Sequence, residues 1–413
     1  MNNIYIAGIA MTVFGRHIER SIDDLAGEAL RGALYDAGCN ADAIGAAFYS
    51  GVTNGHLQGQ ISIPGQVVFS KIGLEGIPVF NVENACASGS TAVHLAVQSL
   101  KAGTCDVALA IGAEKMNVPD KAKAFALFEG GWDVSRVDEN FANLVKLGEG
   151  VEPPDGSESD RPYSRFMSIY AALCRYHMKT YGTTQRQIAA VSAKNHGHSV
   201  HNPLSQFRKP FTIDEVLAAP PITYPITLPM CAPVTDGAAA AILCTEEGLR
   251  RIGADRSRCI KVAASVIRSF THRGIDEPEK NIGRLAALQA YEQASLSPED
   301  MDVAEVHDAS AMGEIIQAEN LGLAQLGLGG VAAERGDFTI GGRIPINTSG
   351  GLESKGHPLG ATGIGQLHEL VTQLRGEAGA RQVWGARHAI QENGGGLQGI
   401  EEAALAVHIL SKP

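Results

Sequence analysis

One cysteine lies in a run of small residues, Asn84-Ala85-Cys86-Ala87-Ser88-Gly89-Ser90, between two segments of different character. Residues 79–82, just before it, are typical of a strand, and residues 91–100 repeat Ala, Val and Leu in a helical pattern. A thiol at this turn lies near a helix N-terminus, where unpaired N–H groups and the helix dipole stabilise a thiolate. The run therefore predicts a strand–turn–helix unit that carries a reactive thiol. The alternative for a lone cysteine is a buried structural residue, and the motifs downstream have to decide between the two.

The composition bounds the class of protein. The chain has 413 residues, 44% of them hydrophobic, which is enough for two or three domains. Its net charge of −11 argues against a nucleic-acid surface. The seven cysteines form no Cys-x-x-Cys pair, which predicts reduced thiols, a cytoplasmic setting and no structural metal site. The N-terminal residues lack the pattern of a signal peptide, and no apolar run approaches the roughly 20 residues of a membrane helix.

The order of the expected elements recurs in the two halves of the chain. The first half is expected to form strands over 4–10, 46–49 and 106–113, with helices over 22–37 and after Cys86. The second half is expected to form strands over 260–266, 303–306, 382–390 and 403–410, with helices over 284–294 and from the Gly-rich turn at 349–363 to 374. Two halves of this kind indicate an internal duplication. Strands that alternate with helices indicate mixed or parallel sheets covered by helices.

A segment of weaker strand character separates the halves. It is richer in Pro, His, Arg and Lys, and residues 149–163 within it are polar and loop-like. The small residues at 236–243 are expected to form the strand that closes the first half. The division predicted from these features is an N-terminal half over 1–116 and 236–258, an inserted loop domain over 117–235, and a C-terminal half over 259–413.

Three further motifs follow expected strands or glycine-rich turns. They are Val306-His307-Asp308-Ala309-Ser310, Gly356-His357-Pro358, and Gln391-Glu392-Asn393-Gly394-Gly395-Gly396. A lone histidine is more often a satisfied core or surface residue. His357 is more specific, because the glycines around it permit a sharp turn and the close approach of a ligand. Together with Cys86, these motifs favour a functional thiol over a structural one.

The four motifs together resemble the thiolase superfamily. Cys86-Ala87-Ser88 is similar to the family's nucleophile loop, Gly356-His357-Pro358 to its Gly-His-Pro loop, and Asp236-Gly237-Ala238-Ala239 to a framework segment. His307-Asp308, with the stretch 194–207, is similar to the sterol-carrier-protein type. The resemblance runs over essentially the whole chain. It implies an α/β thiolase fold, with two duplicated core halves in five αβαβα layers and an inserted loop domain.

The chemistry of the resemblance can also be built from the residues. A thiolate at Cys86 suits attack on a β-carbonyl, since the product thioester stays activated for a second transfer. His357 is the expected base for that thiol. Backbone N–H groups at Cys86 and around Gly394 or Gly395 are expected to hold the acyl oxygen, and His307 with His357 the thioester oxygen, each donor contributing roughly 3 kcal/mol. The residues expected to bind substrate are Ser349, Gly350, Asn393, Gly394 and Gly395.

A second acid/base must serve the carbon that departs as an enolate. The resemblance implies a cysteine, either in a Cys-x-Gly loop or directly after His-Asp, but this chain has Glu392-Asn393-Gly394 and Ala309 at those places. We expect Glu392 to exchange the proton, because a carboxyl group in a dry pocket has a raised pKa. Glu392→Gln should then lose turnover but keep acylation of Cys86. In the alternative, Glu392 is a structural acceptor for loop N–H groups, and water or a histidine handles the proton.

The expected function is cleavage of a 3-oxoacyl-CoA with coenzyme A, or the reverse Claisen condensation. The unusual fourth motif favours a branched or aromatic substrate, such as a benzoylsuccinyl-CoA-like compound. The resemblance implies coenzyme A as a substrate, no metal in this chain, a homodimer, and a small zinc-ribbon/OB-fold subunit as a further partner. The alternatives are a retro-aldolase acting on a β-hydroxyacyl-CoA and a non-catalytic acyl-CoA or lipid-binding protein. Cys86 opposes the first, and Cys86 with both histidines opposes the second.

Overall fold

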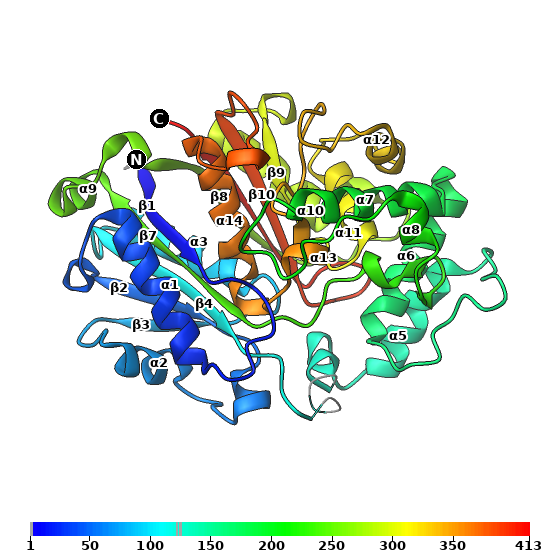
Figure 1. The fold of residues 1–413 in the computed structure, drawn as a ribbon, viewed down its shortest axis with the longest axis horizontal. Coiled ribbons are helices and arrows are strands. Elements are labelled where there is room, and N and C mark those ends of the chain that lie inside the picture. The colour runs from blue at the N-terminus through cyan, green and yellow to red at the C-terminus, as the bar shows by residue number, and fades with distance from the viewer. Residues whose placement is uncertain (1–2, 121–122, 124–125) are drawn as a thin grey trace.

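A computed structural model describes residues 3–120, 123 and 126–413 of the chain. Within these residues, nine strands form one mixed sheet in the order β3-β2-β4-β7-β1-β8-β11-β10-β9 (Figure 1). The first-half strands are β1 (Ile4–Met11), β2 (Ala46–Ser50), β3 (Val79–Val82), β4 (Val107–Glu114) and β7 (Gly237–Thr245). The second-half strands are β8 (Ile260–Ser269), β9 (Val303–Glu305), β10 (His388–Gly395) and β11 (Ala404–Ser411).

The two halves repeat the same strand pattern. In the first half, β2 runs parallel to β4, β4 antiparallel to β7, and β7 antiparallel to β1. In the second half, β9, β10, β11 and β8 follow in the same order with the same directions. The halves join where β1 pairs with β8. This repeat agrees with the internal duplication expected from the order of the elements.

Helices cover the strands in five layers, as the α/β thiolase fold requires. The outer helices of the first half are α1 (Ile22–Ala37) and α2 (Pro64–Ile72), and those of the second half are α10 (Ile282–Ala294) and α11 (Ala311–Asn320). Between the two sets of strands lie α3 (Ser88–Lys101) and α14 (Leu359–Arg375), which pack against each other and against strands of both halves.

The alternation of side chains in β4 shows why the central layer can form. Leu109 and Ile111 face the core under α1, whereas Ala108 and Ala110 face α3 and α14. Successive residues of a strand point to opposite faces. The small alanines on one face let the two central helices approach the sheet closely, so the loops that precede both helices meet at one end of the layer.

The inserted segment is more helical than its expected loop character. It holds α5 (Val137–Val145), α6 (Arg165–Tyr181), α7 (Gln185–Ser199), α8 (Ile213–Leu217), β5 (Pro221–Thr223) and β6 (Ile226–Thr227). The helices α6 and α7 pack on α11 of the second half (Figure 1). Side-chain caps begin both, from Ser164 and Thr184. The expected polar stretch around 149–163 does lie outside regular structure.

Three further short α-helices are α9 (Glu246–Ile252), α12 (Gly329–Arg335) and α13 (Gly351–Lys355). One expected boundary is wrong. The strand expected over 382–390 begins only at His388, because Gln382 and Val383 are held by hydrogen bonds to Gln373 of α14. In the part of the chain that the structure describes, no helix is both long and apolar enough to cross a bilayer.

Candidate active site

The first turns of α3 and α14 bring two of the four motifs together. A Cβ atom added to Gly89 of α3 would lie 2.8 Å from the carbonyl oxygen of Gly360, and one added to Gly112 of β4 would overlap the same carbonyl. The buried carboxylate of Glu114 also accepts the Gly360 N–H at 2.8 Å. These close contacts need glycine at 89 and 112. They fix the loops before the two helices, which carry Cys86 and His357, side by side.

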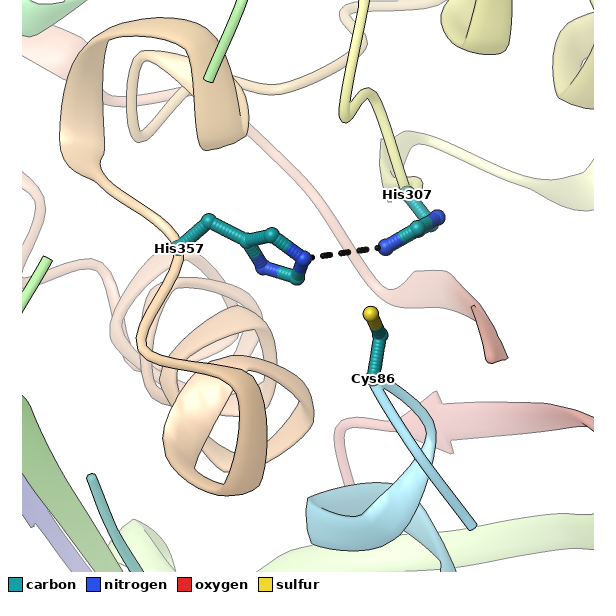
Figure 2. A group of neighbouring side chains, drawn as sticks. All are labelled: Cys86, His307 and His357. Atoms are coloured by element: carbon teal, nitrogen blue, oxygen red, sulfur yellow. Dashed lines mark hydrogen bonds between the residues drawn. The ribbon is translucent and has the colours of Figure 1, made fainter. Parts of the chain in front are cut away.

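His307 completes a cluster of three reactive side chains (Figure 2). It follows the carboxyl end of β9, and its imidazole Nε2 lies 3.4 Å from Nε2 of His357. The sulfur of Cys86 and one nitrogen of each imidazole all lie within 4.8 Å of one another. Segments near 86, 307 and 357 therefore converge on one point, as the sequence predicts for them.

Hydrogen bonding fixes the proton position on His357. Its Nδ1 lies 2.8 Å from Oγ1 of Thr362, and the Thr362 hydroxyl donates to the carbonyl oxygen of Pro358 at 3.0 Å. Because that hydroxyl has used its hydrogen, it accepts one from Nδ1 of His357. Nε2 of His357 is then the basic nitrogen, and it is the one that faces His307 and the sulfur.

Replacing Thr362 by Val tests this assignment. The valine side chain is close to threonine in size but cannot accept the Nδ1 hydrogen, so the imidazole loses its fixed tautomer and orientation. We expect kcat to fall about 10-fold, with a smaller change in KM, by analogy with the loss of outer hydrogen-bond partners of functional histidines. Thr362→Ser keeps the acceptor and should recover most of the rate. Equal rates for the Val and Ser variants would contradict the assigned tautomer.

The three side chains are neutral in the resting site. Burial raises the pKa of the Cys86 thiol to about 12, against the opposing effect of the backbone N–H groups of Cys86 and Gly396. Burial also lowers the pKa of His307 to about 4, and burial together with His307 and Lys355 lowers that of His357 well below its usual value. The expected resting thiolate is thus corrected, since desolvation outweighs the helix N-terminus. A neutral thiol at this place has the imidazole of His357 beside it as a possible acceptor for its proton.

Backbone donors near the sulfur come from the first and fourth motifs. The backbone N–H groups of Cys86 and Gly396 lower the pKa of the thiol, against the larger effect of burial. Gly395 packs against the nucleophile loop, where a Cβ atom would meet the carbonyl oxygen of Asn84 and lie 2.5 Å from the nitrogen of Ala87. The N–H of Gly394 lowers the pKa of the Glu392 carboxyl group, against the larger effect of burial. Of the three glycines, Gly395 and Gly396 line the cavity and Gly394 does not, so a second donor from the fourth motif comes from one of these two residues.

Glu392 lies behind His307. Its Oε2 accepts the backbone N–H of His307 at 2.9 Å, and its side chain is fully buried. Glu392 is not among the described residues that line the cavity at the thiol. This placement fits the structural alternative for Glu392, in which its carboxylate accepts loop N–H groups and so positions His307.

Three residues expected to touch substrate are also fully buried. The hydroxyl and N–H of Ser349 both donate to Glu305, Gly350 packs on Ser199, and Oδ1 of Asn393 accepts from Ser90. Within the described chain, neither they nor Gly394 line the cavity, whereas Gly395 does. The expectation of substrate contact for Ser349, Gly350, Asn393 and Gly394 is therefore corrected. Their part is to hold the loops.

The cavity at the thiol has a volume of about 670 Å³ and a largely apolar wall. Phe128, Phe166 and Leu397 line it, and the ring of Phe166 stacks on Trp132 at 4.8 Å between centroids. The inserted segment supplies much of this wall. Cys86, His307 and His357 lie on the same wall, so an apolar group bound there would present its reactive end to the sulfur.

Sequence reasoning missed two polar residues on this wall, Tyr170 of α6 and Glu402 of the β10–β11 turn. The ring of Tyr170 packs beside Gly313 at the start of α11. Burial raises the pKa of its phenol, and the neighbouring acidic groups of Glu402 and Cys86 raise it further. Glu402 lies ten residues beyond Glu392, outside any motif. The one feature of the sequence that could have indicated Glu402 is its acidic side chain in a partly apolar turn.

The same three ligand atoms that form the cluster are also of the kind that binds zinc. A thiolate and two imidazole nitrogens are common zinc ligands, and a zinc ion needs the thiol deprotonated. Such a complex would occupy the sulfur and both basic nitrogens, so it is incompatible with attack by Cys86.

Comparison with known proteins gives matches over most of the chain. The family described as thiolase, N-terminal domain matches residues 4–223, and thiolase C-terminal domain-like matches residues 271–412. Sterol carrier protein 2 of Homo sapiens is 37% identical over 95% of this chain and 70% of its own length. Acetyl-CoA acetyltransferase of Methanothermobacter thermautotrophicus is 36% identical over the whole of both chains. Benzoylsuccinyl-CoA thiolase subunit BbsB of Thauera aromatica is 32% identical over 92% of this chain and 91% of its own.

Solved structures share the fold. The Ltp2-ChsH2(DUF35) aldolase superposes with a TM-score of 0.75 at 21% identity, over 99% of this chain and 98% of that one. Human mitochondrial 3-ketoacyl-CoA thiolase in complex with CoA superposes with a TM-score of 0.65 at 16% identity, over 100% and 98%. At these sequence identities, the similarity establishes the fold alone. The reaction has to be inferred from the residues of the site.

Proposed function

Because the chain belongs to the thiolase family, we propose that it cleaves a 3-oxoacyl-CoA with coenzyme A through an acyl-enzyme on Cys86, or runs the reverse Claisen condensation. The observation that carries this proposal is the cluster of the Cys86 sulfur and two imidazole nitrogens within 4.8 Å, on the wall of an apolar cavity. A retro-aldolase makes no covalent thioester and has no need of such a thiol.

The steps follow from the atoms at the site. Nε2 of His357 takes the proton of the Cys86 thiol as the sulfur attacks the β-carbonyl. The N–H groups of Cys86 and Gly396 stabilise the oxygen that becomes negative. The backbone N–H of His307 donates to the Glu392 carboxyl group, which positions this residue. Its imidazole then binds the thioester oxygen of the departing enolate. Coenzyme A then attacks the acyl-cysteine and regenerates the thiol.

The proposed substrate carries a bulky apolar acyl group, aromatic or branched. The aromatic side chains of Phe128 and Phe166 favour such a group, and the relative named for benzoylsuccinyl-CoA supports a compound of that kind. We expect a phenyl-substituted 3-oxoacyl-CoA to be cleaved with a higher kcat/KM than acetoacetyl-CoA.

Product analysis tests the function. The protein is incubated with 3-oxo-3-phenylpropionyl-CoA and coenzyme A, and the products are separated by mass. Two new acyl-CoA thioesters, benzoyl-CoA and acetyl-CoA, are the expected result. An aldehyde or ketone released from a β-hydroxyacyl-CoA, with no cleavage of the 3-oxo compound, would instead favour the retro-aldolase. Binding of the acyl-CoA without any turnover would favour the third alternative, a non-catalytic acyl-CoA-binding protein.

We also propose a homodimer that forms at the edge strand β3. Among the described strands, β3 pairs only with β2, and an open strand edge is able to pair with a second chain. Phe80 at this edge is 49% exposed and stacks on Phe48 at 5.0 Å between centroids. Reduced cysteines at seven positions support a cytoplasmic setting for such an assembly.

Phe80→Glu tests the dimer. A charge at the centre of the β3 edge should disfavour pairing, so we expect the mass measured by light scattering to fall from about twice that of the chain to that of one chain. Tyr35→Glu, which places the same charge at an exposed position of α1 away from β3, should leave the mass unchanged. A wild-type monomer, or a dimeric Phe80→Glu variant, would contradict the interface.

A small zinc-ribbon/OB-fold subunit is the further partner that we propose. One similar fold is an aldolase with a DUF35 protein, and one relative is a thiolase subunit. The net charge of −11 gives this chain little general attraction for the phosphates of coenzyme A, which a second subunit could supply.

A further inference from the structure

The thiolase reaction proposed above leaves one proton without a carrier. When the bond between C2 and C3 of the substrate breaks, its electron pair stays on C2, and C2 must receive a proton. During this step the Cys86 sulfur is bonded to C3 and His357 lies beside that sulfur, so this pair does not serve C2. A separate group on the cavity wall has to donate the proton, and the inference below rests on the proposed function.

Glu402 lies beside the backbone that faces the thiol. A Cβ atom added to Gly394 would lie 2.6 Å from Cγ and 3.3 Å from Cδ of Glu402, so the Glu402 side chain fills the space that a residue at 394 would need. Two residues later, Gly396 lines the same cavity as Cys86. The carboxyl group thus adjoins the segment that holds the acyl oxygen.

The anchoring of Glu402 leaves part of its carboxyl group available. Oε1 accepts from Nε2 of Gln317 on α11 at 2.8 Å, and the residue lines the cavity. Burial raises the pKa of the Glu402 carboxyl group, and the neighbouring Glu401 raises it further. Glu402 therefore holds its proton more readily than an exposed glutamate does. A protonated carboxyl group at this place can donate.

The other carboxyl groups on the described wall are committed elsewhere. Glu401 forms a buried ion pair with Arg273 at 2.7 Å and accepts the N–H of Thr271 at 2.6 Å. Glu83 is exposed and accepts the N–H of Ala85 at 2.6 Å. Glu402 is in no ion pair of the described chain, which singles it out as the proton carrier.

We propose that Glu402 is the catalytic acid/base at C2, in place of the Glu392 predicted from the sequence. The Cys86 sulfur bonds to C3, the C2–C3 bond breaks with its electron pair on C2, and Glu402 gives its proton to C2. Water then exchanges protons with both groups, so that Glu402 regains a proton and His357 loses the one it took from Cys86. His357 takes the proton of the coenzyme A thiol as that sulfur bonds to the acyl carbon, and it gives this proton to the Cys86 sulfur as the bond to Cys86 breaks. Condensation runs the same steps in reverse.

The test compares two half-reactions in the full-length protein. Acyl transfer from acetyl-CoA to Cys86 makes no change at carbon, whereas cleavage of a 3-oxoacyl-CoA needs a proton at C2. Glu402→Gln keeps the acceptor for Gln317, so we expect acyl transfer within about threefold of wild type and cleavage slowed about 100-fold or more. In D₂O, the wild-type product acetyl-CoA should carry one deuterium at C2. Glu402→Asp, which retains the carboxyl group, should recover part of the cleavage.

Glu392→Gln is the matched control, because it removes the acidic group of the neighbouring buried carboxyl residue. As a positioning residue for His307, it should slow both half-reactions together. Wild-type cleavage by Glu402→Gln, equal loss in both half-reactions for that variant, or no recovery in Glu402→Asp would overturn the proposal. So would a selective loss of cleavage in Glu392→Gln or in Tyr170→Phe. Failure of the wild-type protein to cleave any 3-oxoacyl-CoA would instead count against the proposed function.

Discussion

Cys86→Ala is expected to lower kcat for cleavage of a 3-oxoacyl-CoA by roughly 10⁴-fold or more, because it removes the atom that forms the acyl-enzyme. The side chain is small and half-buried at the cavity wall, so its loss should leave the fold intact. We expect the thermal unfolding midpoint to stay close to that of the wild-type protein. The measurements are the steady-state rate of thiolysis and a thermal unfolding curve on the same sample.

Cys231→Ala is the control for this variant. Cys231 also lines the cavity, but its thiol donates to the carbonyl oxygen of Thr227 at 3.8 Å and lies outside the histidine cluster. We expect its loss to change kcat by no more than a few-fold. If Cys86→Ala kept more than a hundredth of wild-type activity, or if Cys231→Ala lost as much as Cys86→Ala, the nucleophile would be wrongly assigned.

His357→Gln is expected to lower kcat about 10²- to 10³-fold, which is the usual contribution of a positioned base. Without the imidazole, the thiol of Cys86 has no acceptor for its proton at the moment of attack. Because burial holds the thiol pKa at about 12, spontaneous ionisation at neutral pH cannot replace the base. The rate of acylation by acetyl-CoA, followed by intact mass after rapid quenching, should fall by the same factor as kcat.

His307→Gln separates the two imidazoles. The glutamine amide can still donate to a thioester oxygen, so acylation should fall less than in His357→Gln. The assignment of roles would be reversed if His307→Gln slowed acylation more than His357→Gln did.

Much of the fold followed from the sequence because the two halves repeat. Long periodic segments, such as the helix at 22–37 and the strand at 260–266, have bounds close to those observed. The strand expected at 382–390 begins later than predicted, because its first residues form hydrogen bonds with Gln373. A strand pattern in the sequence does not show a contact with a residue of the preceding helix. The helices of the insertion were underestimated because its proline and charge content resembles that of loops.

At the site, the sequence identified the three side chains that cluster, Cys86, His307 and His357, but it did not place the fourth motif. Three successive glycines at 394–396 leave its alignment ambiguous, and only the fold shows that Gly395 and Gly396 line the cavity whereas Gly394 does not. The same packing keeps Glu392 off the cavity wall and places Gly394 beside Glu402. Tyr170 and Glu402 come from an inserted helix and a hairpin turn, and their meeting at the cavity depends on packing between distant elements.

Intact mass after exposure to a 3-oxoacyl-CoA without coenzyme A tests the central claim most directly. We predict an increase equal to one acyl group, located by peptide mapping on Cys86, and its discharge as acyl-CoA when coenzyme A is added. Turnover in the complete reaction with no rapidly quenched adduct on Cys86, or an adduct that coenzyme A does not discharge, would contradict the proposed chemistry.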